Sequence, residues 1–359
     1  MDSMVVLDAH CDAPSQMLRL RDYGLDNSHA QVDFPKMRRG GVDASFFALY
    51  VPASMQGELA TQYALRLLEE VDRQVAAHND MVSYARCASS VRRNKSNGKL
   101  SVILGIENAS AIGESFELLR EFYRRGVRYI TLTHSADNQV GDSCTGNHTW
   151  GGLSPFGKEL VAEMNRRRMM IDLAHSSDDT MRDVLALSSK PVAYTHGCCR
   201  ALASHKRNIS DELIRGIADG GGIVCMSIYP CFLDDGFVSV LDASALEEKM
   251  WIEDEFIKSP SDPVKVKAWN DLQDELNSLP RPGVSRVVDH IEHAVGVAGI
   301  EHVGIGTDYD GIEVCPCGLE DISKFPALWE EMRRRGFGRK EISMIAGGNF
   351  LRVMRDNRR

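Results

Sequence analysis

Residues 169–196 read MMIDLAHSSDDTMRDVLALSSKPVAYTH, and this stretch decides the fold. Two short apolar runs, Met169–His175 and Pro191–His196, flank the segment Ser177–Leu187, whose apolar residues recur at three- and four-residue spacing. A strand, a helix and a second strand in this order indicate a βαβ unit. Both runs are nearly continuous in apolar residues, as expected for parallel strands that are buried on both faces.

The same alternation extends along the chain in both directions. Further amphipathic segments are Ala60–Ala77, Ser115–Arg125 and Phe156–Arg167. Eight strands that alternate with helices favour a barrel over a doubly wound sheet, so we expect an α/β protein in which residues 1–359 form a single (β/α)₈ TIM barrel domain. The eight expected strands are Met4–His10, Val42–Tyr50, Ser101–Glu107, Arg128–His134, Met169–His175, Pro191–His196, Gly222–Ile228 and His302–Asp308.

A long helical insertion is expected between the seventh and eighth strands, because the interval is far longer than one helix needs. Residues Leu241–Leu279 predict one or two polar helices, broken near Pro260 and Pro263, and Val284–Val297 then serves as the barrel helix. Insertions after a barrel strand lie at the catalytic face. The segment 229–283 therefore either helps to cover a site or is a surface embellishment.

Composition and charge exclude several classes of partner. Hydrophobic residues make up 43% and charged residues 26%, as in ordinary soluble globular proteins. The net charge of −9 argues against nucleic acid, because phosphate binding needs a basic face. No stretch approaches the roughly 20 apolar residues of a membrane span, and neither a secretory signal nor a lipid-anchor signal is visible. The sequence therefore predicts a cytoplasmic protein without a membrane partner.

Ionisable side chains end most of the expected strands. The carboxyl ends of the strands of a (β/α)₈ barrel meet in one mouth, so these side chains would converge there. Buried Asp, Glu and His side chains cost several kcal/mol unless they are paired or bound to metal. The joint pattern therefore indicates a metal site, built from His10, Asp12, Glu107, His134, His175, His196 and Asp308.

Spacing assigns ligands to two ions. His10 and Asp12 are two residues apart and would face the same side of a strand, so they can hold one ion. His175 and His196 follow adjacent strands and can hold a second, and the carboxylate of Glu107 can bridge both. Imidazole and carboxylate ligands without thiolate suit zinc, with manganese, iron or cobalt as alternatives. We expect two Zn²⁺ per chain, bridged by a hydroxide at neutral pH.

The remaining polar residues near the mouth then need roles. His134 could polarise a scissile carbonyl and stabilise the developing oxyanion. Asp308 could take the proton of the attacking water and deliver it to the leaving amine. Arg207, in the loop after the sixth strand, is either a clamp for a substrate carboxylate or a surface arginine. Asp8 either supports the ligands or is structural.

Several short motifs of this sequence resemble motifs of a known family. They are Asp8–Asp12, Phe34–Val42, Gly105–Glu107, Tyr129–His134, Gly152–Gly157, Asp172–Ser176, Thr195–His196, His205–Asn208 and Gly304–Gly311. They resemble the membrane or renal dipeptidases (zinc dipeptidases, peptidase family M19) among the amidohydrolase-like barrels, from about residue 4 to residue 355. The resemblance implies a two-zinc dipeptidase, often a homodimer. Its substrate would be a small dipeptide with a free C-terminal carboxylate, including L-Xaa-D-Xaa dipeptides.

The resemblance also implies a role for each matching residue. Three residues depart from the family. Cys11 stands where the family usually has Asn, and Cys198-Cys199 follow His196 where small polar residues are common. These cysteines could alter substrate preference or sensitivity to oxidation. The family's metal ligands fall on His10, Asp12, Glu107, His175 and His196, its carbonyl-binding histidine on His134, its carboxylate-binding arginine on Arg207 and its proton-shuttling aspartate on Asp308.

Two other functions stay open on the sequence. Related barrels hydrolyse small amides or lactones, but they typically begin with His-x-His and use a carboxylated lysine as the bridge. Here His10-x-Asp12 and Glu107 favour the dipeptidase. A non-catalytic protein on the same fold is the other alternative. Such a protein would be expected to lose ligands, and none is lost here.

Overall fold

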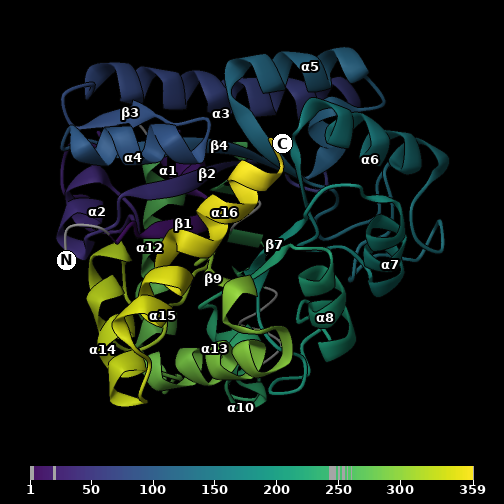
Figure 1. The fold of residues 1–359 in the computed structure, drawn as a ribbon. Coiled ribbons are helices and arrows are strands. Elements are labelled where there is room, and N and C mark those ends of the chain that lie inside the picture. Colours follow the sequence, from purple (N-terminus) through teal and green to yellow (C-terminus); the bar gives the residue numbers. More distant parts are fainter. Residues whose placement is uncertain are drawn as a thin grey trace.

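Eight parallel strands form a nearly closed barrel with helices around it, as predicted (Figure 1). The computed structural model describes residues 4–18, 22–241, 248–249, 251–252, 255–256, 258–259 and 261–358. The strands lie side by side in chain order, and all their pairings are parallel. They are β1 (Leu7–Cys11), β2 (Ala44–Tyr50), β4 (Leu100–Glu107), β5 (Val127–Thr131), β6 (Met170–Asp172), β7 (Ala193–Gly197), β8 (Ile223–Met226) and β9 (Val303–Ile305).

The barrel closes between β1 and the segment that follows β9. The backbone N–H of Asp308 donates to the carbonyl of His10 at 3.0 Å. The backbone N–H of Asp12 donates to the carbonyl of Tyr309 at 2.8 Å. Residues from the two ends of the sequence are thus joined at the carboxyl end of the barrel.

Helices on the outside of the barrel connect its strands (Figure 1). Four of them begin with a serine whose hydroxyl accepts the backbone N–H three residues later, which satisfies a donor that the helix leaves unpaired. These caps are Ser115, Ser154, Ser177 and Ser210. The connecting helices are α2 (Phe34–Gly40), α3 (Gly57–Ala77), α4 (Ala88–Ser96), α5 (Phe116–Arg125), α6 (Pro155–Arg167), α7 (Asp178–Leu187), α8 (Asp211–Asp219) and α13 (Val284–Ala298).

Apolar side chains fill the inside of the barrel and close its amino end. Ile103 of β4, Tyr129 of β5 and Met170 of β6 belong to one buried cluster with Phe350 of α16 (Asn349–Asp356). Helix α16 lies across this end of the barrel (Figure 1). A site can therefore form only at the opposite end, where the strands finish. The other helices after β9 are α14 (Phe325–Arg334) and α15 (Arg339–Ser343), with short turns at Ile322–Lys324 and Met344–Gly348.

The predicted insertion lies between β8 and β9. Helix α12 (Pro263–Ser278) begins at the predicted break, where the side chain of Asp262 accepts the N–H of Val264. Parts of the predicted Leu241–Leu279 helices fall outside the described residues. The short helices α9 (Pro230–Leu233) and α10 (Asp235–Val238) precede them. One strand was not predicted: β3 (Val82–Tyr84) pairs with β4 outside the barrel order.

Four predicted strands end earlier than expected. The predictions ran to His134, His175, Ile228 and Asp308, whereas β5, β6, β8 and β9 end at Thr131, Asp172, Met226 and Ile305. The backbone φ is 66° at His175 and 68° at Asp308, a left-handed conformation that a strand cannot contain. These side chains therefore reach the barrel mouth from loops.

Candidate metal centre

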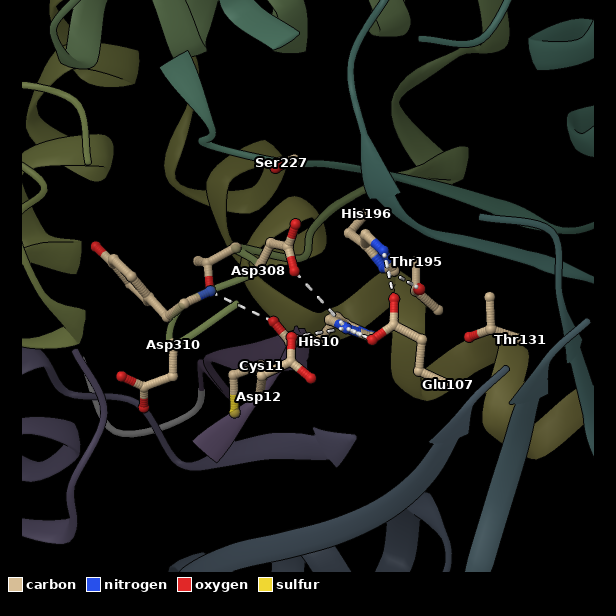
Figure 2. Close-up of polar contacts among 12 residues, drawn as sticks. His10, Cys11, Asp12, Glu107, Thr131, Thr195, His196, Ser227, Asp308 and Asp310 are labelled. Carbon is tan, nitrogen blue, oxygen red and sulfur yellow. Dashed lines mark hydrogen bonds and ion pairs between the residues drawn. The ribbon is translucent and has the colours of Figure 1, made fainter. Parts of the chain in front are cut away.

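A buried carboxylate surrounded by imidazoles lies at the carboxyl end of β4. Oε1 of Glu107 is 2.9 Å from Nε2 of His175, 3.3 Å from Nε2 of His196 and 3.9 Å from Nε2 of His134. Its other oxygen, Oε2, is 3.4 Å from Nε2 of His10. Figure 2 shows Glu107 between His10 and His196. The structure thus brings together four histidines from four different strands or the loops that follow them.

Two further carboxylates face His10 from the closing seam of the barrel. Nε2 of His10 lies 3.5 Å from Oδ2 of Asp12 and 3.8 Å from Oδ1 of Asp308 (Figure 2). His10 and Asp12 were expected to face one side of the same strand, but Asp12 lies beyond β1, at the start of α1 (Ala13–Met17). The pairing of β1 with β2 is irregular between Asp8 and Cys11. Such an irregularity changes the direction in which side chains point. His10 and Asp12 therefore lie close together, as expected, but for a different reason.

Burial and mutual contact shift the pKa values of these groups. Burial alone would raise the pKa of Glu107, but the imidazoles of His10, His175 and His196 hold it well below its usual range. Burial raises the pKa of Asp12 well above its usual range, and the charge of Glu107 raises it further. Burial raises the pKa of Asp308 to about 7.

The donor atoms fit a divalent metal ion. Nε2 of His10 and Oδ1 of Asp12 are buried, and neither has a hydrogen-bond partner among the residues that the structure describes. Buried polar atoms of this kind are costly unless a ligand satisfies them. Imidazole nitrogen and carboxylate oxygen are donors that zinc and similar transition metals accept. Ligand atoms lie within 4.8 Å of one another in three groups: His10, Asp12 and Asp308; Glu107, His134 and His175; and His10, Asp172 and His196.

Arg207 lies beside the centre, in the loop after β7. Its guanidinium is buried, donates to the carbonyl of His196 at 3.1 Å and to the hydroxyl of Tyr194 at 3.3 Å, and leaves Nε without a partner. It forms no ion pair with a carboxylate in the described part of the chain. Its Cζ atom is 5.3 Å from the ring centre of Phe232. Phe232 lines the cavity described next, whereas Arg207 is not among the lining residues.

A cavity of about 200 Å³ opens onto Glu107, His134, His175 and Asp308. Residues of the insertion supply part of its wall, so this segment covers the site and is more than a surface embellishment. The wall residues that follow β8 and β9 are Tyr229, Phe232, Lys249, Phe256, Trp269, Ile312 and Glu313.

The cysteines that depart from the family pattern point away from this cavity. The thiol of Cys11 is buried and lies 3.2 Å from the hydroxyl of Ser45. Cys198 and Cys199 are also buried, and their thiols contact backbone carbonyls at 3.3 and 3.4 Å. None of the three lines the cavity, so the structure gives no contact through which they would alter substrate preference.

Several polar residues beneath the centre were not singled out from the sequence. Asp172 and Thr195 lie next to His196, and the hydroxyl of Tyr129 lies 2.8 Å from Nδ1 of His10. Asp8, left open above, binds Thr307 through two 2.9 Å hydrogen bonds and ties β1 to the end of β9. Asp172 was detectable as the only charged residue before the histidine in the apolar run 169–175.

Comparison with known proteins identifies related sequences along the whole chain. The family model described as "Membrane dipeptidase (Peptidase family M19)" matches residues 1–359. Dipeptidase aclJ of Aspergillus oryzae is 33% identical over 340 residues, which are 92% of this chain and 71% of that protein. Human Dipeptidase 3 is 31% identical over 367 residues, which are 99% of this chain and 65% of that protein. The chain thus spans about two thirds of the human relative.

Solved structures share the fold. The structure of "dipeptidase AC, Metallo peptidase" has a TM-score of 0.82 and 25% identity, and the match covers 99% of both chains. A metallopeptidase from Rhodobacter sphaeroides has the same TM-score at 24% identity, again over 99% of both chains. These matches agree with the barrel described above.

The comparisons contradict the cytoplasmic location predicted from the sequence. That prediction came from the lack of a recognisable signal, whereas the family that the whole chain matches is named for membrane dipeptidases. Within the residues that the structure describes, no helix combines the length and the apolar character that crossing a bilayer requires.

Proposed function

Because this chain belongs to the membrane dipeptidase family of metallopeptidases, peptidase family M19, we propose that it hydrolyses small dipeptides at the centre around Glu107. The convergence of four imidazoles on one buried carboxylate is the observation that carries this proposal. The adjoining cavity reaches this carboxylate, so a small substrate can meet the centre directly.

We propose that the centre holds two zinc ions. His10 and Asp12 would bind one ion, His175 and His196 the other, and the two oxygens of Glu107 would each face one ion. The division follows the distances, because His10 lies nearest Oε2 whereas His175 and His196 lie nearest Oε1. Bound zinc supplies Lewis acidity and lowers the pKa of water, which gives a hydroxide nucleophile at neutral pH.

His134 is placed to act on the substrate carbonyl. Its side chain is 18% exposed and lines the cavity. Burial lowers its pKa to about 4 and the charge of Arg207 lowers it too, although the charge of Glu107 acts in the opposite direction, so the ring is neutral at neutral pH. A neutral imidazole can donate one hydrogen bond. We assign His134 to the carbonyl oxygen, where a donor stabilises the negative charge that develops during attack.

Asp308 is placed to move the proton. Its carboxylate lines the cavity and lies 3.8 Å from Nε2 of His10, within the seam that closes the barrel. We assign it to accept the proton of the attacking water and to deliver that proton to the leaving amine. The left-handed backbone at Asp308 turns the chain at this point, as often occurs at functional positions.

Arg207 is assigned to the C-terminal carboxylate of the dipeptide. A buried guanidinium with an unsatisfied Nε is suited to a carboxylate ligand. Arg207 lies next to the cavity wall, because its Cζ atom is 5.3 Å from the ring centre of Phe232, which lines the cavity. The Rhodobacter sphaeroides neighbour was crystallised with a phosphinate mimic of the dipeptide L-Ala-D-Ala. We include L-Xaa-D-Xaa dipeptides in the proposed substrate class on this ground and on the family resemblance.

Hydrolysis of a mixed dipeptide library, with L-Xaa-L-Xaa and L-Xaa-D-Xaa members, tests the proposal. Zinc-loaded protein should release free amino acids, and a chelator should abolish the release. The preferred members identify the stereochemistry at the second position. Protein that carries two zinc ions per chain and cleaves no dipeptide would contradict the proposal. Amides and lactones of similar size would then be the substrates to assay.

A further inference from the structure

We propose that Asp172 is a positioning residue that fixes which ring nitrogen of His196 carries the proton, through the hydroxyl of Thr195. Neither Asp172 nor Thr195 lines the cavity that would hold the substrate. The inference rests on the proposed metal centre and adds the residues that prepare one of its ligands.

The carboxylate of Asp172 is fully buried and saturated with donors. Its Oδ2 accepts the hydroxyls of Thr131 at 2.5 Å and Thr195 at 2.7 Å. Its Oδ1 accepts the backbone N–H groups of Thr195 at 2.9 Å and Ala174 at 3.1 Å. Each oxygen therefore has two donors, which uses its lone pairs. This argues against Asp172 as a direct metal ligand, although an oxygen of Asp172 lies within 4.8 Å of ring nitrogens of His10 and His196.

The hydroxyl of Thr195 has a single proton, and it points to Asp172. The oxygen of the same hydroxyl lies 2.9 Å from Nδ1 of His196. Because its proton is already donated, Thr195 can only accept a hydrogen bond from this nitrogen. Nδ1 then carries the ring proton, and Nε2 keeps its lone pair. Nε2 is the nitrogen that faces the centre, 3.3 Å from Oε1 of Glu107.

An irregular strand makes this contact available. Neighbouring residues of a regular strand point to opposite faces, so Thr195 and His196 should not meet. The pairing of β7 with β8 is irregular between Tyr194 and Gly197, which brackets both residues. Figure 2 shows Thr195 beside His196 at this point.

In the other half of the centre, different groups fix the position of the ring proton of His10. Nδ1 of His10 lies 2.8 Å from the hydroxyl oxygen of Tyr129. That hydroxyl can donate its proton to the carbonyl of Ala9, at 3.4 Å, while it accepts a hydrogen bond from Nδ1 of His10. Nε2 of His10 is left without a hydrogen-bond partner and faces the carboxylates. Both histidines thus present Nε2 to the centre.

Two threonines on Asp172 provide a matched pair of variants. Thr131→Val and Thr195→Val each remove one buried hydroxyl from the same carboxylate oxygen, but only Thr195 contacts a histidine. Asp172→Asn is a third variant of nearly the same shape. Its amide oxygen must serve the two backbone N–H groups, so its NH₂ faces Thr195. The hydroxyl of Thr195 would then donate to Nδ1 of His196 and move the ring proton to Nε2.

The test measures zinc affinity by competition with a chromophoric chelator, starting from the metal-free full chain. Thr195→Val and Asp172→Asn should lose about 10- to 100-fold in affinity for one zinc ion. Thr131→Val, and Thr195→Ser as the conservative rescue, should keep the affinity of the unmodified chain. The absorption bands of bound Co²⁺ should change only in the two weakened variants. The melting temperature of each metal-free variant shows that it is folded.

The outcomes separate this inference from the function on which it rests. Equal weakening by Thr131→Val and Thr195→Val would overturn it, because the network would then only support the fold. Full affinity in Asp172→Asn would also overturn it. If the unmodified chain binds no zinc, the metal centre and the proposed function fail together.

Discussion

At the scale of the residue, Glu107 is the group that the centre cannot replace. It is the one carboxylate that all four histidines contact, and its two oxygens face different halves of the centre. Glu107→Gln keeps the shape but removes the charge and one acceptor. We expect loss of bound zinc and of activity, measured as metal per chain after dialysis. Glu117→Gln on the exposed face of α5 is the control. Two ions per chain in Glu107→Gln would refute the bridging role.

Asp308→Asn should separate proton transfer from metal binding. The amide cannot accept the proton of the attacking water, so kcat should fall by at least about 100-fold. The zinc content should stay that of the unmodified protein, because the proposed ligands are unchanged. Steady-state kinetics and metal analysis of the same preparation check both points. Near-normal turnover would mean that another group moves the proton.

The sequence predicted which residues would meet but not how they would do so. Apolar strands alternate with helices in the sequence and end in ionisable residues. This pattern predicted that Glu107 and His196 would lie at the same end of the barrel. The proximity of His10 and Asp12 depends on an irregular strand and a turn, which alternation does not describe. The contact of Thr195 with His196 has the same origin, because adjacent residues meet only where pairing is irregular.

At the scale of the element, the insertion is tied to the cavity by one ion pair. Nζ of Lys249 lies 2.7 Å from Oε2 of Glu313, which is 1% exposed, and Glu313 also accepts the hydroxyl of Tyr229 at 2.6 Å. Lys249→Met removes this ion pair between the insertion and the segment after β9. We expect a rise in the KM of dipeptides with a smaller change in kcat, because the wall changes and the centre does not.

Another lysine of the insertion is the matched control for Lys249. Lys267 of α12 pairs with Asp271, and its side chain is 74% exposed. Lys267→Met should leave both kinetic constants unchanged. Equal effects of the two substitutions would show that the Lys249 contact has no specific role at the cavity.

Helix α13 carries a histidine that should make stability depend on pH. His290 is fully buried, accepts the N–H of Cys199 at Nδ1 and lies 3.0 Å from the carbonyl of Leu233 through Nε2. Burial lowers its pKa from 6.5 to about 4. Between pH 6.5 and about pH 4, His290 therefore binds a proton in the unfolded chain but not in the folded chain. This group should cost about 3 kcal/mol of stability across that window.

Thermal unfolding at several pH values checks the role of His290. The stability of the unmodified protein should fall between pH 6.5 and about pH 4, and the fall should be smaller in His290→Gln. The comparison isolates this residue, because the histidines of the centre are present in both proteins. An identical pH dependence in the two proteins would show that His290 contributes nothing to it.

The barrel strands were predictable because each is a short apolar run, and each of the eight expected runs overlaps an observed strand. Strand β3 was missed because it lies outside the barrel, pairs only with β4 and is only partly buried, so no apolar run marks it. The ends of β5, β6, β8 and β9 were placed too far along the chain. His175 and Asp308 have a left-handed backbone conformation that tertiary contacts fix. The sequence around them has the polarity of a strand end, so it does not reveal that the strand has already finished.

At the scale of the whole molecule, zinc should stabilise the fold, because its proposed ligands lie on β1, β4 and β7, at the start of α1 and in the loop after β6. A ligand at 1,000 times its Kd adds about 4 kcal/mol to the folded state. Removal of zinc should therefore lower the melting temperature in differential scanning calorimetry, and added zinc should restore it. We also propose that residues 1–359 form one domain. Two separate unfolding transitions in the zinc-loaded protein would refute that proposal.

The seam that closes the barrel also sets the order in which the protein can mature. His10 and Asp12 are synthesised well before Asp308 and Tyr309, whose backbones bind theirs. At roughly 5–20 residues per second, a ribosome needs about 15–60 s between these two points. A nascent chain during that time has ligands but no closed barrel to hold them in place. We therefore expect zinc to bind stably only after the segment that follows β9 has been synthesised and has closed the barrel.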